Sequence, residues 1–269
     1  MSNPNLEAQV EAAKAYEALF VPALFAQWAP KIIDAANVLA GQSVLDVACG
    51  TGVLASEARL RTGPTGYVAG LDPGVGMLAV AKELVPSLDW RQGTAESMPF
   101  ADASFDAVVS QFGLMFMDRD KALREMLRVL KPQGRLVVAV WDNVQNIPAY
   151  AAEVSLLDRL AGTRAADALR APFALGDCKL LGELFNKAGA SSVMITTSKG
   201  VARFPSIRVM VEADLRAWLP VMGVSLSEEE IVRILEEAED ALDSYVTDDG
   251  RVTFEAPAHV VTATKSQLE

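Results

Sequence analysis

The chain has few of the residues on which several classes of protein depend. Its 269 residues include two cysteines, Cys49 and Cys178, and one histidine, His259. Two cysteines are too few for a disulfide framework or a cysteine-rich metal site, and we expect no bound metal. No apolar run approaches the roughly 18 residues that a membrane-spanning helix needs. His259 falls inside a predicted strand, where we expect a structural role.

Basic residues are also in short supply. The 24 lysines and arginines face 35 aspartates and glutamates, which gives a net charge of −11. Such a field repels nucleic acid, and no cluster of basic residues offsets it. The polar, acidic start of the chain has neither the apolar core of a secretory signal nor the basic character of a transit peptide. We therefore expect a cytoplasmic protein with no nucleic-acid partner and no membrane insertion.

What the chain does have is a hydrophobic content of 51%, ample for a buried core. Its first half alternates short apolar runs with helical patterns, which predicts an open α/β sheet with right-handed crossovers. A helix is expected near residues 119–130, ending where Lys131-Pro132-Gln133-Gly134 breaks the pattern. The predicted strands cover residues 43–48, 66–72, 88–92, 105–110 and 135–141.

The second half reads differently. Residues 145–171 have a helical pattern, and two β-rich runs, 192–204 and 252–264, are separated by about 45 residues, far more than a hairpin needs. Within this insert, Ser227 and Glu230 match a capping box ahead of an amphipathic helix. Its apolar stripe, from Ile231 to Leu242, must pack on a partner, either the mouth of a binding pocket or a second copy of the chain.

These patterns predict a division of the chain into parts. The segment 1–40 is expected to be helical. Residues 41–204 and 249–269 are expected to form the α/β domain, a doubly wound, seven-stranded and mostly parallel sheet. Residues 205–248 are expected to be a helical lid insertion, with 145–171 as a second lid element.

The strongest chemical signal is the stretch from Val44 to Gly52. An apolar strand leads into Asp46 and then into a turn of small residues that precedes a helix. Small residues allow a ligand to approach the backbone, and the helix N-terminus offers free N–H groups. A carboxylate at this position suits an ammonium group better than a pyrophosphate. The spacing also departs from the Gly-x-Gly-x-x-Gly pattern typical of nicotinamide cofactors.

Three further segments follow at regular intervals. Asp72 closes the next strand, where an acid commonly binds ribose hydroxyls. The run 93–100 follows the third strand, and the run 104–112 leads from the fourth strand into a loop at the crevice of the sheet. No single one of these segments is a specific signal, but their order and spacing together are specific.

With these motifs in place, the chain resembles the class I S-adenosylmethionine (SAM)-dependent methyltransferases. Within them it is most similar to the ubiquinone/menaquinone-biosynthesis (UbiE-like) small-molecule enzymes. The likeness is strong over residues 40–141 and rests on topology elsewhere. It implies the Rossmann-like methyltransferase fold, SAM as cofactor and S-adenosylhomocysteine (SAH) as product.

The resemblance also implies roles for individual residues. The glycine-rich loop would hold the methionine part of the cofactor, Asp72 its ribose, Pro73 and Met77 the adenosine, and the loop after the third strand its adenine. The loop after the fourth strand would lie near the reacting methyl group. The implied cofactor-binding residues are Asp46, Ala48, Gly50, Gly52, Asp72, Pro73, Met77, Thr94, Ala95, Glu96, Gln111 and Phe112.

The expected reaction is in-line methyl transfer to a small, apolar acceptor. The alternatives are a catalytically silent SAM-binding regulator or scaffold and, less favoured, a nicotinamide-dependent oxidoreductase. If residues 252–264 form one strand antiparallel to the others, Glu255 lies at the active-site edge and is the candidate general base. A homodimer through the apolar stripe of the insert is a further possibility left open by the sequence.

Overall fold

The computed structural model describes residues 4–265, which fold into two compact units. One, the sheet unit, contains residues 4–140, 177–198 and 259–265 of this range. The other, the helical unit, contains residues 141–176 and 199–258. Within the described range, no helix is both long and apolar enough to cross a membrane.

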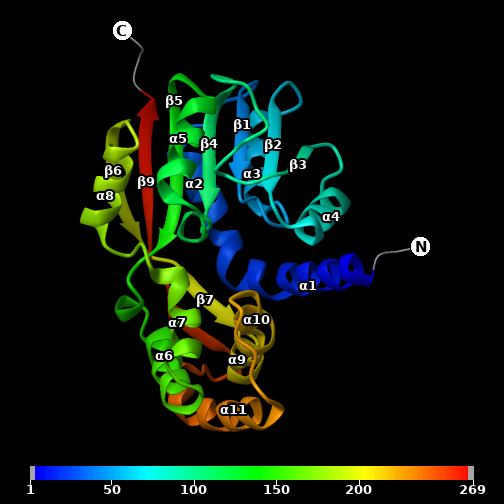
Figure 1. Ribbon diagram of the computed structural model, residues 1–269, viewed down its shortest axis with the longest axis vertical. Coiled ribbons are helices and arrows are strands. Elements are labelled where there is room, and N and C mark those ends of the chain that lie inside the picture. The colour runs from blue at the N-terminus through cyan, green and yellow to red at the C-terminus, as the bar shows by residue number, and fades with distance from the viewer. Residues whose placement is uncertain (1–3, 266–269) are drawn as a thin grey trace. The chain divides into compact units, whose positions relative to one another are not determined.

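The sheet unit is built on seven strands in the order β3-β2-β1-β4-β5-β9-β6 (Figure 1). Parallel registers join β3 to β2, β2 to β1, β1 to β4 and β4 to β5. The red β9 runs opposite to its neighbour β5. The strands are β1 (Ser43–Val47), β2 (Tyr67–Asp72), β3 (Asp89–Gln92), β4 (Phe105–Gln111), β5 (Leu130–Trp141), β6 (Ala190–Ser198) and β9 (Ala258–Lys265).

The central strands are apolar on both faces because helices cover both sides of the sheet. Val44, Leu45 and Val47 of β1 are all fully buried, as are the residues of β5 from Leu136 to Ala139. The seven-stranded, mostly parallel sheet with flanking helices confirms the predicted fold class. The helices of this unit are α1 (Pro4–Phe20), α2 (Ala29–Ala35), α3 (Val53–Thr62), α4 (Val75–Leu84), α5 (Arg119–Val129) and α8 (Cys178–Lys187).

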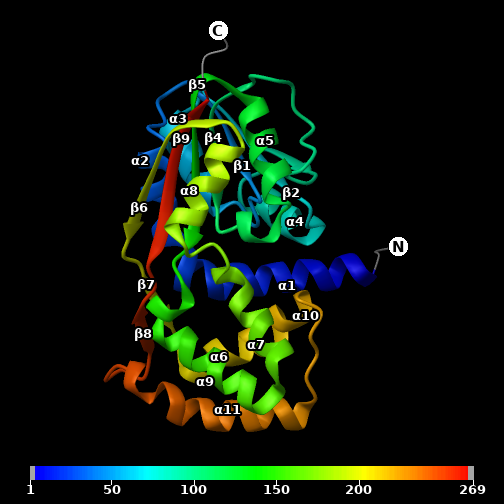
Figure 2. The same ribbon diagram turned by 60° about the vertical axis from the view of Figure 1, so that its left-hand side comes forward.

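The N-terminal helix α1 belongs to the sheet unit. Figures 1 and 2 show it lying across the end of the sheet at which β1, β2 and β4 finish. It packs closely on α4: a Cβ atom at Gly76 would lie 2.4 Å from the carbonyl oxygen of Gln9. A π-helical turn, η1 (Val21–Phe25), then bends the chain toward α2. The N-terminal segment that was expected to be helical is therefore part of the sheet unit, with α1 packed on α4.

The helical unit has its own core. Its helices are α6 (Pro148–Ala161), α7 (Thr163–Arg170), α9 (Ile207–Ala213), the π-helical η6 (Asp214–Trp218), α10 (Leu219–Val221) and α11 (Glu228–Leu242). The predicted capping box of Ser227 and Glu230 is present at the start of α11. The apolar stripe from Ile231 to Leu242 is buried within this unit, where α11 packs on α6 and α9. The stripe is thus not an open surface for a second copy of the chain.

The two late β-rich runs are each broken in two, which corrects the expectation of two continuous strands. The run 192–204 divides into β6 and β7 (Val201–Phe204), and the run 252–264 divides into β8 (Val252–Glu255) and β9. β7 and β8 pair antiparallel in a separate two-stranded sheet of the helical unit. Pro257, which has no N–H to donate, stands at the break between β8 and β9. The N–H of Ala256, at the same break, donates to the carbonyl of Gly200, which stands at the break between β6 and β7 (2.9 Å).

The unit boundaries consequently differ from the predicted ones. Residues 199–204 and 249–258, expected on the main sheet, lie in the helical unit together with 145–171 and 205–248. The helix near residues 119–130 ends at Val129, before Lys131-Pro132-Gln133-Gly134, as predicted, but β5 begins earlier than the predicted residue 135. These residues are the irregular start of β5, where the register with β4 shifts between Phe105 and Ala107. Proline is tolerated at such a bulge because no ladder hydrogen bond is lost.

Candidate functional site

A glycine-rich turn joins β1 to α3 at the carboxyl end of the sheet. Three of its residues have positive φ angles: Ala48 (58°), Gly50 (54°) and Gly52 (94°). A Cβ atom at Gly52 would lie 2.5 Å from the ring of Trp90, so this position requires glycine. At Gly50, by contrast, a Cβ atom would have no protein atom within 4 Å. The turn is therefore packed on one side and open at Gly50.

Two aspartates hold this turn in shape. Asp46 is buried, and its Oδ2 accepts a hydrogen bond from the Ala55 N–H in the first turn of α3 (2.9 Å). Asp72 accepts from two N–H groups, Gly50 to Oδ2 (2.9 Å) and Gly74 to Oδ1 (2.7 Å). Asp72 thus joins the end of β2 to the open part of the turn. Both residues lie where the sequence placed them.

The surroundings of these aspartates are acidic. Burial raises the pKa of Asp46 well above its usual range, and the charge of Asp72 raises it further against the lowering effect of the Ala55 N–H. Burial also raises the pKa of Asp72, while the Gly74 and Gly50 N–H groups lower it. Burial and then the charges of Asp46 and Asp72 raise the pKa of the buried Cys49 thiol, which disfavours the thiolate that a nucleophilic cysteine needs.

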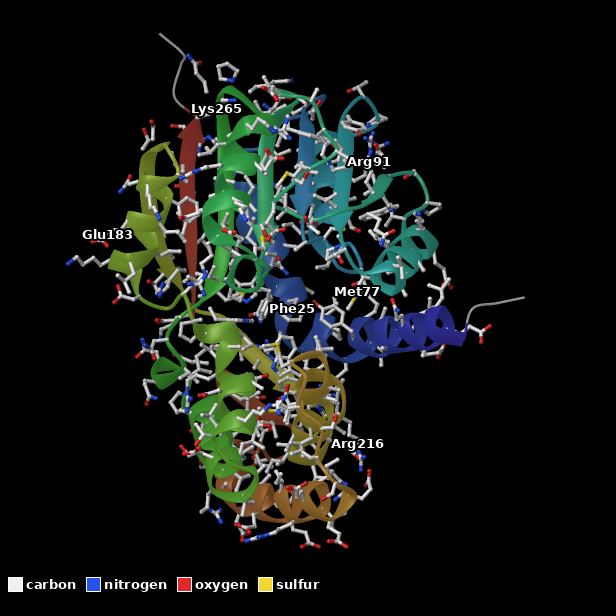
Figure 3. All side chains as sticks on the ribbon, viewed as in Figure 1. Phe25, Met77, Arg91, Glu183, Arg216 and Lys265 are labelled. Atoms are coloured by element: carbon white, nitrogen blue, oxygen red, sulfur yellow. The ribbon has the colours of Figure 1, made fainter. Side chains whose placement is uncertain are left out.

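Aromatic residues of the N-terminal segment cover the adjoining end of β4. The Tyr16 ring stacks on Phe25 with centroids 5.5 Å apart, and Phe25 meets Phe112 at 5.7 Å. Gln111 donates from Nε2 to the Phe25 carbonyl (3.2 Å), and the fully buried Trp28 packs edge-on against Phe112. Figure 3 shows Phe25 and Met77 at this same end of the sheet, close to α1. The structure therefore brings Gln111 and Phe112 together with α1.

The remaining predicted residues lie on two neighbouring loops. Pro73 and Met77 flank Gly74, beside Asp72, and the Pro73 carbonyl accepts from Gln92 Nε2 (3.4 Å). Thr94 is exposed and Ala95 is buried. The Glu96 carboxylate accepts from the Asp118 N–H (2.9 Å), which ties this loop to the start of α5. Glu96 therefore has a structural partner in addition to any contact with a ligand.

Three oxygens around this turn are buried and have no hydrogen-bond partner among the described residues. They are Asp46 Oδ1, Thr51 Oγ1 and Gln111 Oε1. Thr51 stands inside the stretch from Val44 to Gly52, but sequence reasoning gave it no role of its own. The carboxyl and amide oxygens require donors or positive charge, whereas the Thr51 hydroxyl can accept or donate. The residues thus fit a ligand with ammonium, sulfonium or hydroxyl groups, and they do not fit a pyrophosphate.

Glu255 does not lie on the seven-stranded sheet. It ends β8 in the helical unit, where its exposed carboxylate pairs with Lys199 (2.9 Å). The prediction of Glu255 as general base requires residues 252–264 to form one strand of the main sheet. Because β8 is not part of that sheet, the geometric reason for this prediction does not hold. His259 is buried in β9, with Nδ1 at 2.9 Å from Thr197 Oγ1, in keeping with a structural role.

The helical unit contains a second group of buried acids. Glu153 on α6 and Asp214 at the start of η6 are both buried, and Glu153 Oε1, Glu153 Oε2 and Asp214 Oδ2 have no hydrogen-bond partner among the described residues. Burial raises the pKa of both carboxyls, and the charge of Asp214 adds to this effect on Glu153. Across the part of the chain that the structure describes, no three acidic, histidine or cysteine side chains are grouped to hold a metal ion.

The segment that carries the glycine-rich turn is similar to known proteins. Residues 45–138 match the family model described as a methyltransferase domain. The chain is 48% identical over 118 residues to the demethylmenaquinone methyltransferase of Renibacterium salmoninarum, covering 44% of this chain and 48% of that protein. It is 41% identical over 126 residues to the ubiquinone/menaquinone biosynthesis C-methyltransferase UbiE of Hahella chejuensis, covering 44% and 51%. The chain thus spans about half the length of the curated relatives it matches.

Solved structures share the fold at low sequence identity. The YcgJ protein of Bacillus subtilis aligns with a TM-score of 0.59 and 21% identity, over 90% of this chain and 99% of that one. Phosphoethanolamine N-methyltransferase 2 of Haemonchus contortus, solved with phosphomonomethylethanolamine and S-adenosylhomocysteine, aligns with a TM-score of 0.59 and 19% identity, over 95% and 57%. The chain is therefore similar to methyltransferases over residues 45–138 and shares the Rossmann-like fold of these solved structures, which confirms the resemblance seen in the sequence.

Proposed function

We propose that this protein transfers the methyl group of SAM to a small, apolar acceptor and releases SAH. The observation that carries the proposal is the set of partnerless oxygens at an acidic, glycine-rich turn. SAM has a net positive charge and offers an ammonium group, a sulfonium and ribose hydroxyls. The domain match over residues 45–138 and the methyltransferase relatives support the same assignment.

The residues of the sheet unit would share the work of binding. Gly50 leaves the backbone open to the methionine part of the cofactor, and Asp46 offers it a free oxygen. Asp72 would accept from the ribose hydroxyls, with Pro73 and Met77 beside the adenosine. Ala48 and Gly52 shape the turn, and Thr94, Ala95 and Glu96 belong to the loop proposed to flank the adenine.

Once bound, SAM supplies an already activated methyl group. The protein's part is to align acceptor, methyl carbon and sulfur and to exclude water. Gln111 and Phe112, at the end of β4, are the proposed residues nearest the methyl group. The buried rings of Phe112 and Trp28 make this end of the strand apolar, which suits an apolar acceptor.

The proposal extends to the setting of the reaction. A quinone precursor, polyketide or lipid is the proposed kind of acceptor, and the relatives named for menaquinone and ubiquinone biosynthesis support the first. A cytoplasmic location and the absence of a nucleic-acid partner agree with the net charge of −11. The helices of residues 145–171 and 205–248 are proposed to select the acceptor, because the family match ends at residue 138.

Calorimetric titration of the purified chain with SAM, SAH and NAD⁺ tests the cofactor. We expect SAM and SAH to bind and NAD⁺ not to bind, and NAD⁺ binding alone would favour the oxidoreductase alternative. Incubation with methyl-labelled SAM and reduced 1,4-naphthoquinone then tests transfer. Label in the quinol identifies an enzyme, whereas SAM binding without transfer to quinols, phenols or lipid extracts favours the silent regulator.

A further inference from the structure

Three residues that carry reactive or polar side chains come together on the sheet unit, outside the segments proposed to bind the cofactor. Cys178 is the first residue of α8, Thr197 lies near the end of β6, and His259 lies near the start of β9. β9 and β6 are neighbours in the sheet, and α8 packs on β6 (Figure 2). The fold thus brings His259 to a cysteine 81 positions away and a threonine 62 positions away in the sequence.

The imidazole of His259 contacts both of the other side chains. The Cys178 Sγ lies 3.5 Å from Nε2 and 3.6 Å from Nδ1 of the ring. The Thr197 Oγ1 lies 2.9 Å from Nδ1. The threonine hydroxyl therefore orients the ring, and the sulfur lies within hydrogen-bond distance of it. A nucleophile beside a base that a third group orients is the arrangement that activates thiols in proteins.

The cysteine and the histidine differ in their access to solvent. His259 is 2% exposed, whereas Cys178 is an exposed, free cysteine. A small molecule can therefore reach the sulfur while the ring is held inside the protein. The other cysteine of the chain, Cys49, is buried, so it is not available to attack an adduct formed on Cys178.

The neighbours of Cys178 on α8 do not supply a base. The Asp177 carboxylate accepts hydrogen bonds from the N–H groups of Lys179 (2.8 Å) and Leu180 (3.1 Å), so it already caps the positive end of the helix. Lys179 carries a positive charge and Asp177 a negative one, and their effects on the thiol oppose each other. The group in contact with the sulfur that can accept its proton is His259.

We propose that Cys178 is a modification site that reacts with small disulfides, with His259 as its base and Thr197 as the residue that positions the ring. A bond forms between the Cys178 Sγ and one sulfur of the small disulfide, whose own S–S bond breaks. His259 takes the thiol proton and passes it to the departing sulfur, which keeps the electron pair of the broken bond. The products are a mixed disulfide on Cys178 and one small thiol, and no further oxidant is consumed. The inference does not depend on the proposed function.

The rate of disulfide exchange tests this inference. The probe is 4,4′-dithiodipyridine, an uncharged disulfide whose reaction releases an absorbing thiopyridone. The reference is a synthetic peptide of residues 174–186, which keeps the sequence neighbours of Cys178 but lacks His259. We expect Cys178 of the folded protein to react at least about tenfold faster than the peptide at pH 7. The fast phase should be absent from Cys178→Ser, and His259→Gln should react at the rate of the peptide.

Thr197 offers a matched pair of variants. Thr197→Ser keeps the hydroxyl and should keep the wild-type rate, whereas Thr197→Val keeps the shape of the side chain and should slow the reaction several-fold. This pair decides the question if the change at the buried His259 prevents folding. A folded wild type that reacts no faster than the peptide overturns the inference, as do equal rates for the two Thr197 variants. A folded His259→Gln protein that reacts as fast as wild type overturns it as well.

Discussion

At Gly50, the effect of backbone strain can be distinguished from the effect of filling the space that the ligand needs. Its φ of 54° is unfavourable for a side chain, and a Cβ atom there would enter open space beside Asp72. We expect Gly50→Val to abolish SAM binding, because the branched side chain fills the space that the ligand needs. Calorimetric titration measures the loss.

Gly63 provides the matched control for that variant. It also has a positive φ, 65°, and also has open space at its Cβ position, but it ends α3 at the far end of that helix from the turn. With a φ of 65° and a ψ of −171°, Gly63 has a conformation that is almost confined to glycine, so Gly63→Val should lose about 1–3 kcal/mol of stability, with SAM affinity unchanged. Equal losses of affinity in both variants would show that strain, and not ligand space, is responsible at Gly50.

Asp46 should make SAM binding depend on pH. Burial raises its pKa well above the usual range, so the carboxyl of the free protein keeps its proton to a higher pH than an exposed aspartate does, and a bound cation would favour loss of that proton. Binding should therefore release protons, and affinity should rise with pH until Asp46 has ionised in the free protein. Titrations in two buffers with different ionisation enthalpies measure the number of protons released. Asp46→Asn should abolish this proton release, and a wild-type protein that takes up protons on binding would contradict the assignment.

At the scale of elements, the buried pair on α6 and η6 should set the pH dependence of the helical unit. Burial raises the pKa of Asp214 to about 8, whereas in the unfolded chain it returns to about 4. Between these values the folded state keeps a proton that the unfolded state has lost. The contribution of Asp214 to stability is therefore complete below about pH 4 and is lost as the pH rises to about 8.

Asp214→Asn tests this dependence, because an amide stays neutral at every pH. We expect the stability of the variant relative to wild type to increase by at least about 1 kcal/mol between pH 5 and pH 8. Urea denaturation followed by tryptophan fluorescence gives both values. Asp240→Asn, on the exposed face of α11, should show no such change. A wild-type stability that rises from pH 5 to pH 8 would contradict the prediction.

The elements also show where sequence reasoning succeeds. Local signals are sufficient for the capping box at Ser227 and for the Asp177 cap of α8, since both involve residues three positions apart or fewer. They are also sufficient for the turn after β1. They fail at the breaks in the late strands, where the hydrogen bond between Ala256 and Gly200 joins residues more than fifty positions apart.

The same limit explains Tyr16. It is an ordinary residue of a helix, and only the docking of α1 at the end of the sheet places its ring on Phe25, which packs on Phe112. Pairing across the sheet cannot be deduced from periodicity alone. The glycine turn and its aspartates could therefore be predicted, while the residues that close over them could not.

For the whole molecule, the net charge of −11 should speed the arrival of a cationic ligand. Long-range attraction raises association rates and is screened as ionic strength rises. We expect the association rate of SAM to fall several-fold between 10 and 200 mM salt, and that of SAH, which has no net charge, to change little. Stopped-flow fluorescence can follow both reactions, because Trp90 packs against Gly52 of the turn. Equal salt dependence for the two ligands would contradict this expectation.

The order of the strands has a consequence for synthesis on the ribosome. β9 is the last strand of the sheet to be translated, yet it lies between β5 and β6. Until residues 258–265 have left the exit tunnel, β5 presents an unpaired edge and β6 has no neighbour to join. The helical unit likewise consists of two separate segments of the chain, and residues 141–176 are translated well before residues 199–258. A nascent chain therefore exposes an unpaired strand edge while residues 142–257 are translated, and we expect its folding to depend on chaperones that bind during this interval.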